Sequence, residues 1–319
     1  MRTQVHKQIA AVLAILLLGA WSPILAQDKP KQDPIELAAQ NPKLFIAVMV
    51  KQKGWEVPAE PMKVSDNLYF VGTKGLSVWL TKTSEGLILM NTGMPGSGPM
   101  IEASIRKLGF KPEDIKIILA GHAHIDHVGG HAYMKKLTGA QVVMLDSAVD
   151  LMESGGKNDF NYAGVAEFTY EPVKVDRVIR DGDTVRLGDV ILTAVHTPGH
   201  TIGSTTWLMN LTDGGKTYKI IFPDGAGFNP GYRLAVNPSY PGIGDDYRRT
   251  FAILEMQKPD IWLFAHTDAL NMDDKRARTP TEGIQAWVDP EGFRKWVVNG
   301  RALFEAQVDK EMSAAATPK

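Results

Sequence analysis

A strand-like run in the middle of the chain leads directly into a loop that is crowded with metal-ligand side chains. Ile115–Ala120 is almost entirely apolar, which is typical of a buried strand. Four strong ligands follow in the six positions from 122 to 127: His122, His124, Asp126 and His127. Such a cluster is costly to assemble without a cation. We therefore expect a metal site at the end of this strand.

The spacing of these ligands indicates two metals rather than one. In an extended loop, residues two apart point the same way, so His122 and His124 are expected to bind one metal together. Asp126 and His127 lie where the chain turns into a helix, and they are expected to bind a second metal. Zinc takes imidazole and carboxylate ligands, and a catalytic zinc keeps one position open for water. Two metals about 3.5–4 Å apart can share a hydroxide.

Two later histidines are placed to complete these ligand sets. His196 ends the strand pattern Val190–His196, and His266 immediately follows the strand pattern Ile261–Ala265. Side chains at the ends of separate strands converge at one edge of a sheet, where active sites tend to form. We therefore expect one further histidine for each metal.

Cysteine is absent from all 319 residues, so a transition metal can be held only by His, Asp or Glu. The same absence excludes a disulfide framework, a thiolate zinc finger, an iron–sulfur cluster and a cysteine nucleophile. Among the remaining histidines, His131 is expected to be an exposed residue near a helix start. His200 is expected to orient a metal ligand through a hydrogen bond.

The N-terminus has the pattern of a cleaved secretory signal at residues 1–26. Arg2 and Lys7 precede the apolar run Ile9–Trp21, which is shorter than the roughly 20 residues of a spanning helix. Cleavage leaves 33 basic residues of the original 35 against 36 acidic ones, a net charge of −3. This balance disfavours binding to nucleic acid or to an anionic membrane. We expect a periplasmic or secreted monomer that acts on a small molecule.

Strand patterns and helical patterns alternate along the rest of the chain. An N-terminal extension is expected at residues 27–62, with helical spacing that Pro42 interrupts, and a single domain at residues 63–319. Strands are expected at Leu68–Thr73, Leu76–Thr83, Gly86–Asn91, Ile115–Ala120, Gln141–Leu145, Val185–Leu187, Val190–His196, Ser204–Leu211, Lys216–Phe222 and Ile261–Ala265. Helices are expected at Ser97–Leu108, Val128–Leu137, Ser147–Glu153, Asp245–Met256 and Asp289–Met312. Two strand-rich halves, each interleaved with helices, indicate two packed sheets with helices on the outer faces.

The ligand loop, the segment His196–Trp207 and the late His266 together resemble the motifs of the metallo-β-lactamase superfamily. The resemblance extends from about Leu68 to Lys275. It is greatest to the subclass B3 enzymes, which have three histidines at the first site and no cysteine ligand at the second. Further B3-like stretches are Pro230–Leu234, Tyr240–Ile243, Asp246–Phe251 and His266–Asp273.

This resemblance implies an α/β (α+β) protein with the αββα sandwich of the metallo-β-lactamase fold. It implies two Zn²⁺ ions per chain, with two ligand sets: His122, His124 and His196 for the first ion, and Asp126, His127 and His266 for the second. The implied activity is opening of the β-lactam ring of penicillins, cephalosporins or carbapenems, which would confer antibiotic resistance. Zinc-bound hydroxide would attack the carbonyl carbon, with Asp126 orienting the hydroxide.

Four positions depart from the B3 pattern. Asn91 replaces an aspartate and Gly121 replaces a threonine, and both changes are expected to weaken support of the ligands. Gly225 stands in place of a serine, and Gly227 stands where a second hydroxyl is usual. These two positions and Asn229 are the expected substrate contacts. Without the hydroxyls, ordinary β-lactams are expected to bind poorly.

Two alternative functions stay open. A lactonase or a glyoxalase-type thioesterase of the same fold uses a bridging aspartate at the position that aligns with Gly225, and Asp224 lies one residue away. The second alternative is a zinc-binding protein with little catalysis, which Asn91, Gly121 and Gly225 suggest. A nuclease is disfavoured by the acidic balance and the export signal.

Overall fold

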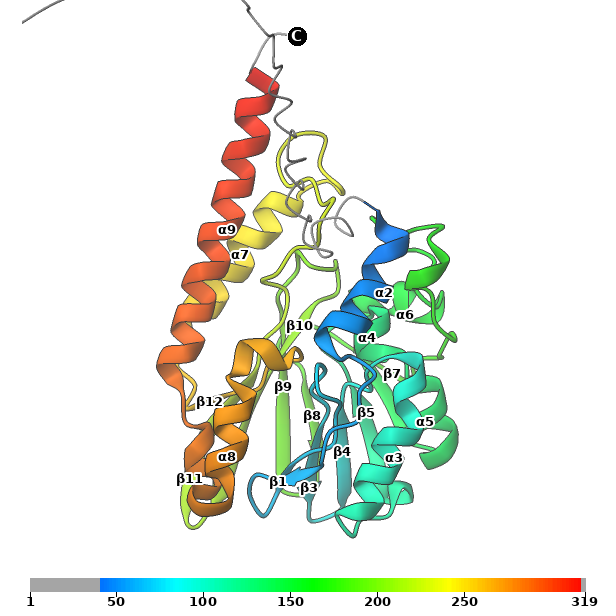
Figure 1. Cartoon of the computed structure of the whole chain (residues 1–319), viewed down its shortest axis with the longest axis vertical. Helices are drawn as coiled ribbons and strands as arrows, with labels where there is room; N and C mark the ends of the chain where they lie inside the picture. Colours follow the sequence, from blue (N-terminus) through cyan, green and yellow to red (C-terminus); the bar gives the residue numbers. More distant parts are fainter. Residues whose placement is uncertain (1–40, 317–319) are drawn as a thin grey trace, which may run out of the picture. The chain divides into compact units, whose positions relative to one another are not determined.

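The structure, a computed structural model, describes residues 41–316 of the chain. Within this range the chain forms two β-sheets that lie between two groups of helices, as Figure 1 shows. The αββα arrangement predicted from the alternation of strands and helices is confirmed.

The larger sheet places the ligand loop at the end of an interior strand. Its seven strands are hydrogen-bonded in chain order: β1 (Met62–Lys63), β2 (Leu68–Phe70), β3 (Trp79–Thr83), β4 (Gly86–Met90), β5 (Ile115–Leu119), β6 (Gln141–Leu145) and β7 (Arg177–Ile179). Strands β1 to β4 are antiparallel neighbours, whereas β4 to β7 run parallel. All of β5 except Lys116 is buried, as expected for a parallel strand covered on both faces.

The smaller sheet brings two further histidine-bearing loops to one edge. Its five strands are ordered β12 (Ile261–Trp262), β11 (Lys216–Phe222), β10 (Thr205–Asp213), β9 (Val190–His196) and β8 (Thr184–Leu187). Neighbouring strands are antiparallel except for β11 and β12, which are parallel. It follows that β9 and β12 run in the same direction. The loops after them, which carry His200 and His266, therefore leave the sheet at the same edge.

The described part of the chain contains eight α-helices, which flank the two sheets or lie at the edge reached by the ligand loop. They are α2 (Pro42–Lys53), α3 (Gly98–Lys107), α4 (Ile125–Val128), α5 (His131–Thr138), α6 (Val149–Glu153), α7 (Ile243–Met256), α8 (Met272–Glu282) and α9 (Pro290–Ala316). In Figure 1, α3 and α5 lie on the side of the larger sheet, while α7, α8 and α9 lie on the opposite side. Helix α8 was not predicted, because it contains Pro280 and presents few apolar residues.

The helix predicted at Val128–Leu137 is wrong in its boundaries. The chain already turns at His124, whose carbonyl accepts the N–H of Val128, and this turn makes the short helix α4. Gly129 and Gly130 then separate α4 from α5. A Cβ on either glycine would collide with the backbone of the loop that follows β4, at Pro95 or Thr92. The ligand loop therefore ends in a tight helical turn that packs against this neighbouring loop.

The two sheets are joined where the ligand loop begins. Trp207 on β10 is fully buried and donates its indole N–H to the carbonyl of Ala120, at 2.9 Å. The backbone N–H of Thr205, also on β10, donates to the carbonyl of Gly121, the residue after Ala120, at 2.7 Å. The backbone just before His122 is therefore fixed by the opposite sheet.

Of the features predicted near the N-terminus, the structure describes helix α2 and not the signal at residues 1–26. The signal lies outside the described residues, whereas α2 begins at Pro42 with Asn41 as its N-cap. Phe45 and Ile46 on α2 are buried. Among the described residues, no helix has the length and apolar character needed to cross a membrane.

Candidate metal centre

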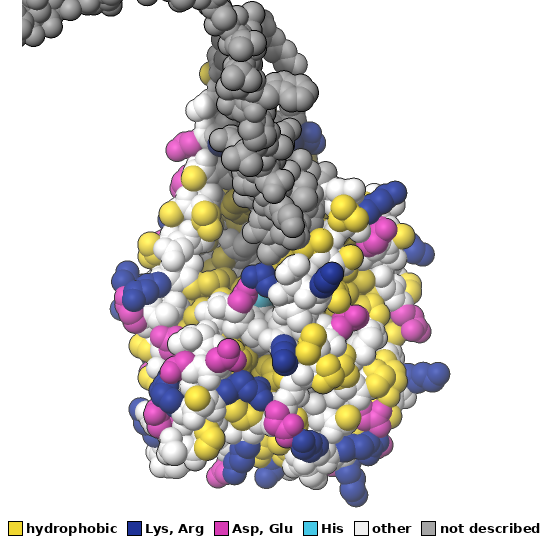
Figure 2. All heavy atoms as spheres, viewed as in Figure 1, with side chains coloured by type: hydrophobic (Ala, Val, Ile, Leu, Met, Phe, Trp, Pro, Cys, Tyr) yellow, Lys and Arg dark blue, Asp and Glu magenta, His cyan; other side chains and the backbone are white. Residues whose placement is uncertain are grey.

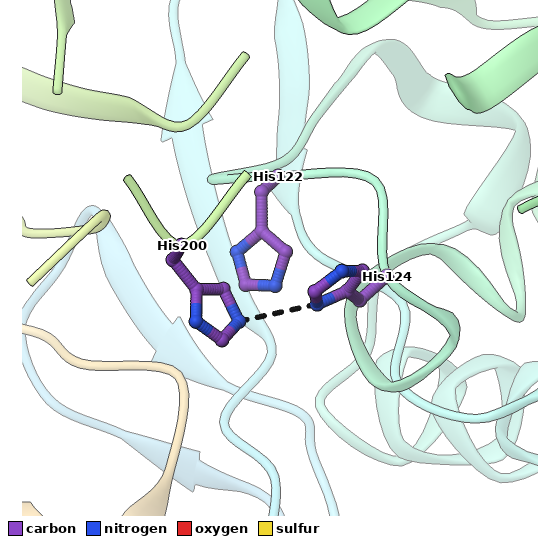
Figure 3. Close-up of side chains that lie close together, drawn as sticks. All are labelled: His122, His124 and His200. Carbon is purple, nitrogen blue, oxygen red and sulfur yellow. Dashed lines mark hydrogen bonds between the residues drawn. The ribbon is translucent and has the colours of Figure 1, made fainter. Parts of the chain in front are cut away.

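Three imidazole rings converge just beyond the end of β5. His122, His124 and His200 each offer a ring nitrogen, and these atoms lie within 4.8 Å of one another. His124 Nδ1 lies 3.1 Å from His200 Nε2. Figure 3 shows the His122 ring pointing into the space between the other two. This set, called the first cluster below, has the geometry of a three-histidine metal site.

The structure places His200 in the first cluster and leaves His196 out, which is a correction to the sequence-based placement of these two residues. The Nε2 atom of His196 lies 2.8 Å from the carbonyl oxygen of Ile202, and its backbone N–H binds Asp181. The chain needs the further residues Thr197–Gly199 to travel from the end of β9 to the other two histidines. The second histidine of the motif, rather than the first, therefore reaches the cluster.

The second predicted set is brought together as expected. Asp126, His127 and His266 form a group with ligand atoms within 4.8 Å of one another, called the second cluster below. Asp126 Oδ2 lies 3.6 Å from His127 Nε2 and 3.4 Å from His266 Nε2. The carboxylate thus lies between the two imidazoles at the edge where the sheets meet.

The donor atoms of both clusters fit cations. His122 Nε2 and both ring nitrogens of His127 are buried without a hydrogen-bond partner in the structure. A buried polar atom left unpaired costs about 1–3 kcal/mol, so three in one place call for a ligand. Burial, followed by the neighbouring histidines, holds the pKa of His122 and of His127 well below the usual range. Both rings are therefore neutral at pH 7, the form that binds zinc.

Each ring of the first cluster also has a protein hydrogen-bond partner at the ring nitrogen that does not face the other two rings. His122 Nδ1 lies 2.9 Å from Asp224 Oδ2, His124 Nε2 lies 2.9 Å from Asp159 Oδ2, and His200 Nδ1 donates to the carbonyl of Gly227 at 3.0 Å. Such partners fix the tautomer and the orientation of a metal-binding histidine. They leave His122 Nε2, His124 Nδ1 and His200 Nε2 facing the shared space.

Two of these supporting groups were not assigned from the sequence. Asp159 lies in a long loop between α6 and β7 that contains no motif. For Asp224, the sequence predicts a role only in the alternative function, as a bridging ligand. His131 was expected to be exposed, but it is fully buried and its Nδ1 lies 2.7 Å from the hydroxyl of Thr92. Burial lowers the pKa of His131 to about 3, so this histidine is a neutral structural residue.

Gly121 and Asn91 shape the start of the ligand loop. A Cβ at Gly121 would overlap Oδ2 of Asp224, so the missing side chain makes room for the carboxylate that holds His122. Asn91 has a φ of 63°, a left-handed conformation that asparagine tolerates, and its side-chain oxygen accepts the N–H of Gly121 at 3.3 Å. Both departures from the family pattern therefore make contacts that position the loop.

Because Gly121 makes room for Asp224, we expect Gly121→Ala and Asp224→Ala to weaken zinc binding by the same route, through the support of His122. Each variant alone should weaken zinc binding at the first cluster by about 10–100-fold, because each disturbs the support of His122. In the double variant the overlap no longer exists, so the effect should be no larger than that of Asp224→Ala alone. Competition with a chromophoric zinc chelator measures all three affinities. Additive effects in the double variant would show that Gly121 acts independently of Asp224.

A pocket of about 230 Å³ opens onto both clusters. Its wall includes members of each cluster, together with aromatic and apolar side chains from α2 and from the loop after it. Trp55, which is buried, lies with its ring centre 5.4 Å from that of His266. Asn229 also lines this pocket, and Gly225 and Gly227 line the adjoining recess of about 160 Å³. The three predicted substrate contacts therefore all lie beside the metal clusters.

Comparisons with known proteins identify a family model and solved structures to which this chain is similar. Residues 72–209 match the family model of the metallo-beta-lactamase superfamily. The structure of BJP-1, a subclass B3 metallo-beta-lactamase of Bradyrhizobium japonicum, is 40% identical with a TM-score of 0.77, and the match covers 83% of this chain and 99% of that one. Native FEZ-1 metallo-beta-lactamase from Legionella gormanii is 39% identical with a TM-score of 0.78, over 80% of this chain and 98% of its own.

A curated relative, a hydroxyacylglutathione hydrolase, matches a smaller region. The hydroxyacylglutathione hydrolase of Methylobacterium sp. (strain 4-46) is 31% identical over 109 residues. That match covers 34% of this chain and 35% of the relative. The extended likeness is therefore to the B3 structures, and the likeness to this hydrolase is local.

Proposed function

Because the chain belongs to the metallo-β-lactamase superfamily, we propose that it is a di-zinc hydrolase that opens the β-lactam ring of penicillins, cephalosporins or carbapenems. The fold and its structural relatives support a hydrolase, and the B3 relatives match over nearly their whole length. The observation that carries the proposal is the pair of three-ligand clusters on one pocket, with His124 and His200 from the first cluster and Asp126 and His266 from the second.

Different residues of the chain would have different roles in such a reaction. Bound zinc would supply Lewis acidity and a water molecule whose pKa is lowered to about 7. The first cluster would hold one ion, with Asp224 and Asp159 keeping the rings of His122 and His124 in their binding orientation. Asp126 has two carboxylate oxygens, so it can bind the second ion with one and accept a proton from the nucleophilic water with the other.

Metal analysis is the first test of this proposal. The purified mature protein should bind close to two zinc ions per chain, one for each cluster. It should hydrolyse a carbapenem or a cephalosporin, lose the activity on treatment with a chelator, and be insensitive to serine-directed acylating agents. A protein that contains no zinc after zinc loading would contradict the hydrolase proposal.

A second candidate function has one observation in its favour. The carboxylate of Asp224 forms a group with His122 and His127, with ligand atoms within 4.8 Å. A carboxylate at this place could reach a metal directly, as the bridging aspartate of thioesterases and lactonases does. Measuring kcat/KM for a carbapenem beside an acyl-homoserine lactone and a hydroxyacylglutathione thioester separates the two candidates. A higher kcat/KM for either of the latter would favour the second.

We also propose export to the periplasm or the medium as a monomer that binds neither nucleic acid nor membrane after processing. The proposal rests on the signal pattern of residues 1–26 and on the charge of the remaining chain. Mass spectrometry of the protein expressed with its full N-terminus should find Gln27 as the first residue, and sedimentation should give the mass of one chain. An unprocessed N-terminus would contradict the proposed export.

A further inference from the structure

The described residues that line the pocket over the two clusters, and those that line its adjoining recess, include a single lysine or arginine, Lys53. Penicillins, cephalosporins and carbapenems all carry a carboxylate next to the β-lactam nitrogen. The positions where the B3 pattern supplies hydroxyls for such a group are Gly225 and Gly227, which have no side chain to offer. The carboxylate therefore needs another partner in this pocket.

Backbone hydrogen bonds connect the end of α2, where Lys53 lies, to the loop that carries His266. Lys53 is the last residue of α2, and the next residue, Gly54, accepts the N–H of Gly75 through its carbonyl at 3.1 Å. The carbonyl of Gly75 in turn accepts the N–H of Thr267, which directly follows His266, at 3.2 Å. Two backbone hydrogen bonds thus connect the end of α2 to the loop that carries a metal ligand.

The ammonium group of Lys53 has spare hydrogen-bonding capacity. In the described part of the chain its partner is Asp268, with Nζ 3.0 Å from Oδ2. The side chains of Lys53 and Asp268 are 36% and 57% exposed, so the pair lies at the opening of the pocket. A lysine ammonium has three donors, of which this ion pair uses one. Figure 2 shows a small area of histidine surface with basic and acidic groups beside it.

We propose that Lys53 binds the carboxylate of the substrate and thereby makes the pocket selective for anionic substrates. The inference rests on the proposed hydrolase function and adds a specificity-determining residue to it. The substrate carboxylate binds the free donors of Lys53, while the scissile carbonyl faces the two clusters. Asp268 lies beside the same ammonium and repels the incoming anion, so it limits the affinity that Lys53 provides.

The remaining wall suits the rest of such a substrate. Phe45, Ile46 and Met49 extend from α2 along the same pocket, and Trp55 closes its floor beside His266. These side chains offer an apolar surface to the substituents of a β-lactam but no charge. Because α2 carries both this surface and Lys53, one helix supplies the charge contact and the apolar contact.

The test compares each substrate with its neutral ester. In Lys53→Met, which keeps the apolar stem of the side chain, KM for a cephalosporin carboxylate should rise about tenfold, the size of one lost charge-assisted hydrogen bond. KM for the methyl ester of the same cephalosporin should change less than about twofold. Asp268→Asn should lower KM for the carboxylate and leave the ester unchanged. Lys51→Met, at an exposed lysine on the same helix turn, is the matched control and should behave as the wild type.

The outcomes separate this inference from the proposed function. Equal effects of Lys53→Met on acid and ester, or no effect on either, overturn the role of Lys53 while the β-lactamase proposal stands. A zinc-loaded protein that opens no β-lactam but cleaves glutathione thioesters overturns the proposed function alone. In that case the same variants are compared on the thioester and its dimethyl ester, with the same expected difference. A zinc-loaded protein that hydrolyses neither class overturns both.

Discussion

His200→Ala should remove one of the two zinc ions and lower kcat/KM for a β-lactam by about a thousandfold. The His200 Nε2 atom completes the first cluster with His122 and His124, and its loss leaves two ligands for that ion. A metal that polarises a reacting carbonyl contributes several kcal/mol, and about 4 kcal/mol corresponds to a thousandfold change in rate. Zinc content by plasma emission spectroscopy and steady-state kinetics measure the two effects.

His196→Ala is the matched control, because the two histidines belong to one motif only four positions apart. The ring of His196 binds the carbonyl of Ile202 and lies outside both clusters. We expect this variant to keep two zinc ions and to lose only a modest amount of stability. A protein that loses zinc on His196→Ala and keeps it on His200→Ala would contradict the arrangement seen in the structure and restore the assignment implied by the sequence resemblance.

Gly225→Ser, which restores the residue usual in B3 enzymes, should destabilise the protein instead of improving substrate binding. Gly225 has a φ of 85°, and a Cβ there would overlap the carbonyl oxygen of Thr197. The strained backbone conformation costs about 1–3 kcal/mol, and the steric overlap adds to that cost. Thermal unfolding followed by circular dichroism should show a Tm lowered by more than about 5 °C, or a largely insoluble protein.

Gly227→Ser distinguishes this explanation from a general intolerance of the loop. Within residues 41–316, and apart from its two chain neighbours, no atom lies within 4 Å of the Cβ position at Gly227, and its φ is not in the left-handed region. The serine should therefore be accepted with a Tm close to that of the wild type, while placing a hydroxyl at the rim of the recess. If Gly225→Ser unfolds at the same temperature as Gly227→Ser, the steric argument fails.

Much of the fold and of the ligand loop could be predicted because local patterns agree with tertiary structure there. The β5 run is apolar because the strand is covered on both faces. The four ligand side chains directly after it would be energetically costly to bury together without a cation. The same reasoning placed His266 in the second cluster, although β12 ends at Trp262 and is shorter than the expected strand Ile261–Ala265. Asp126, His127 and His266 consequently meet as expected.

The errors arise where the outcome depends on distances between segments. His196 is the last residue of β9 and His200 lies in the loop after it, and only the path of that loop decides which ring reaches His122. Asp159 comes from a loop without a motif, so nothing local marks it as the partner of His124. Gly121 was interpreted as a lost hydroxyl, whereas its role is set by the carboxylate of Asp224, a hundred positions away in the chain.

If the two clusters bind zinc as proposed, the metal would bind only the completely folded chain. Their residues come from the segment after β5, the loop after β9 and the loop after β12, so a chain in which either sheet is missing cannot assemble them. Zinc would then bind the native state far better than any partly folded one, and it would stabilise that state by mass action in proportion to the logarithm of its free concentration. The thermodynamic stability of this protein would thereby be coupled to the zinc supply of the compartment in which it folds.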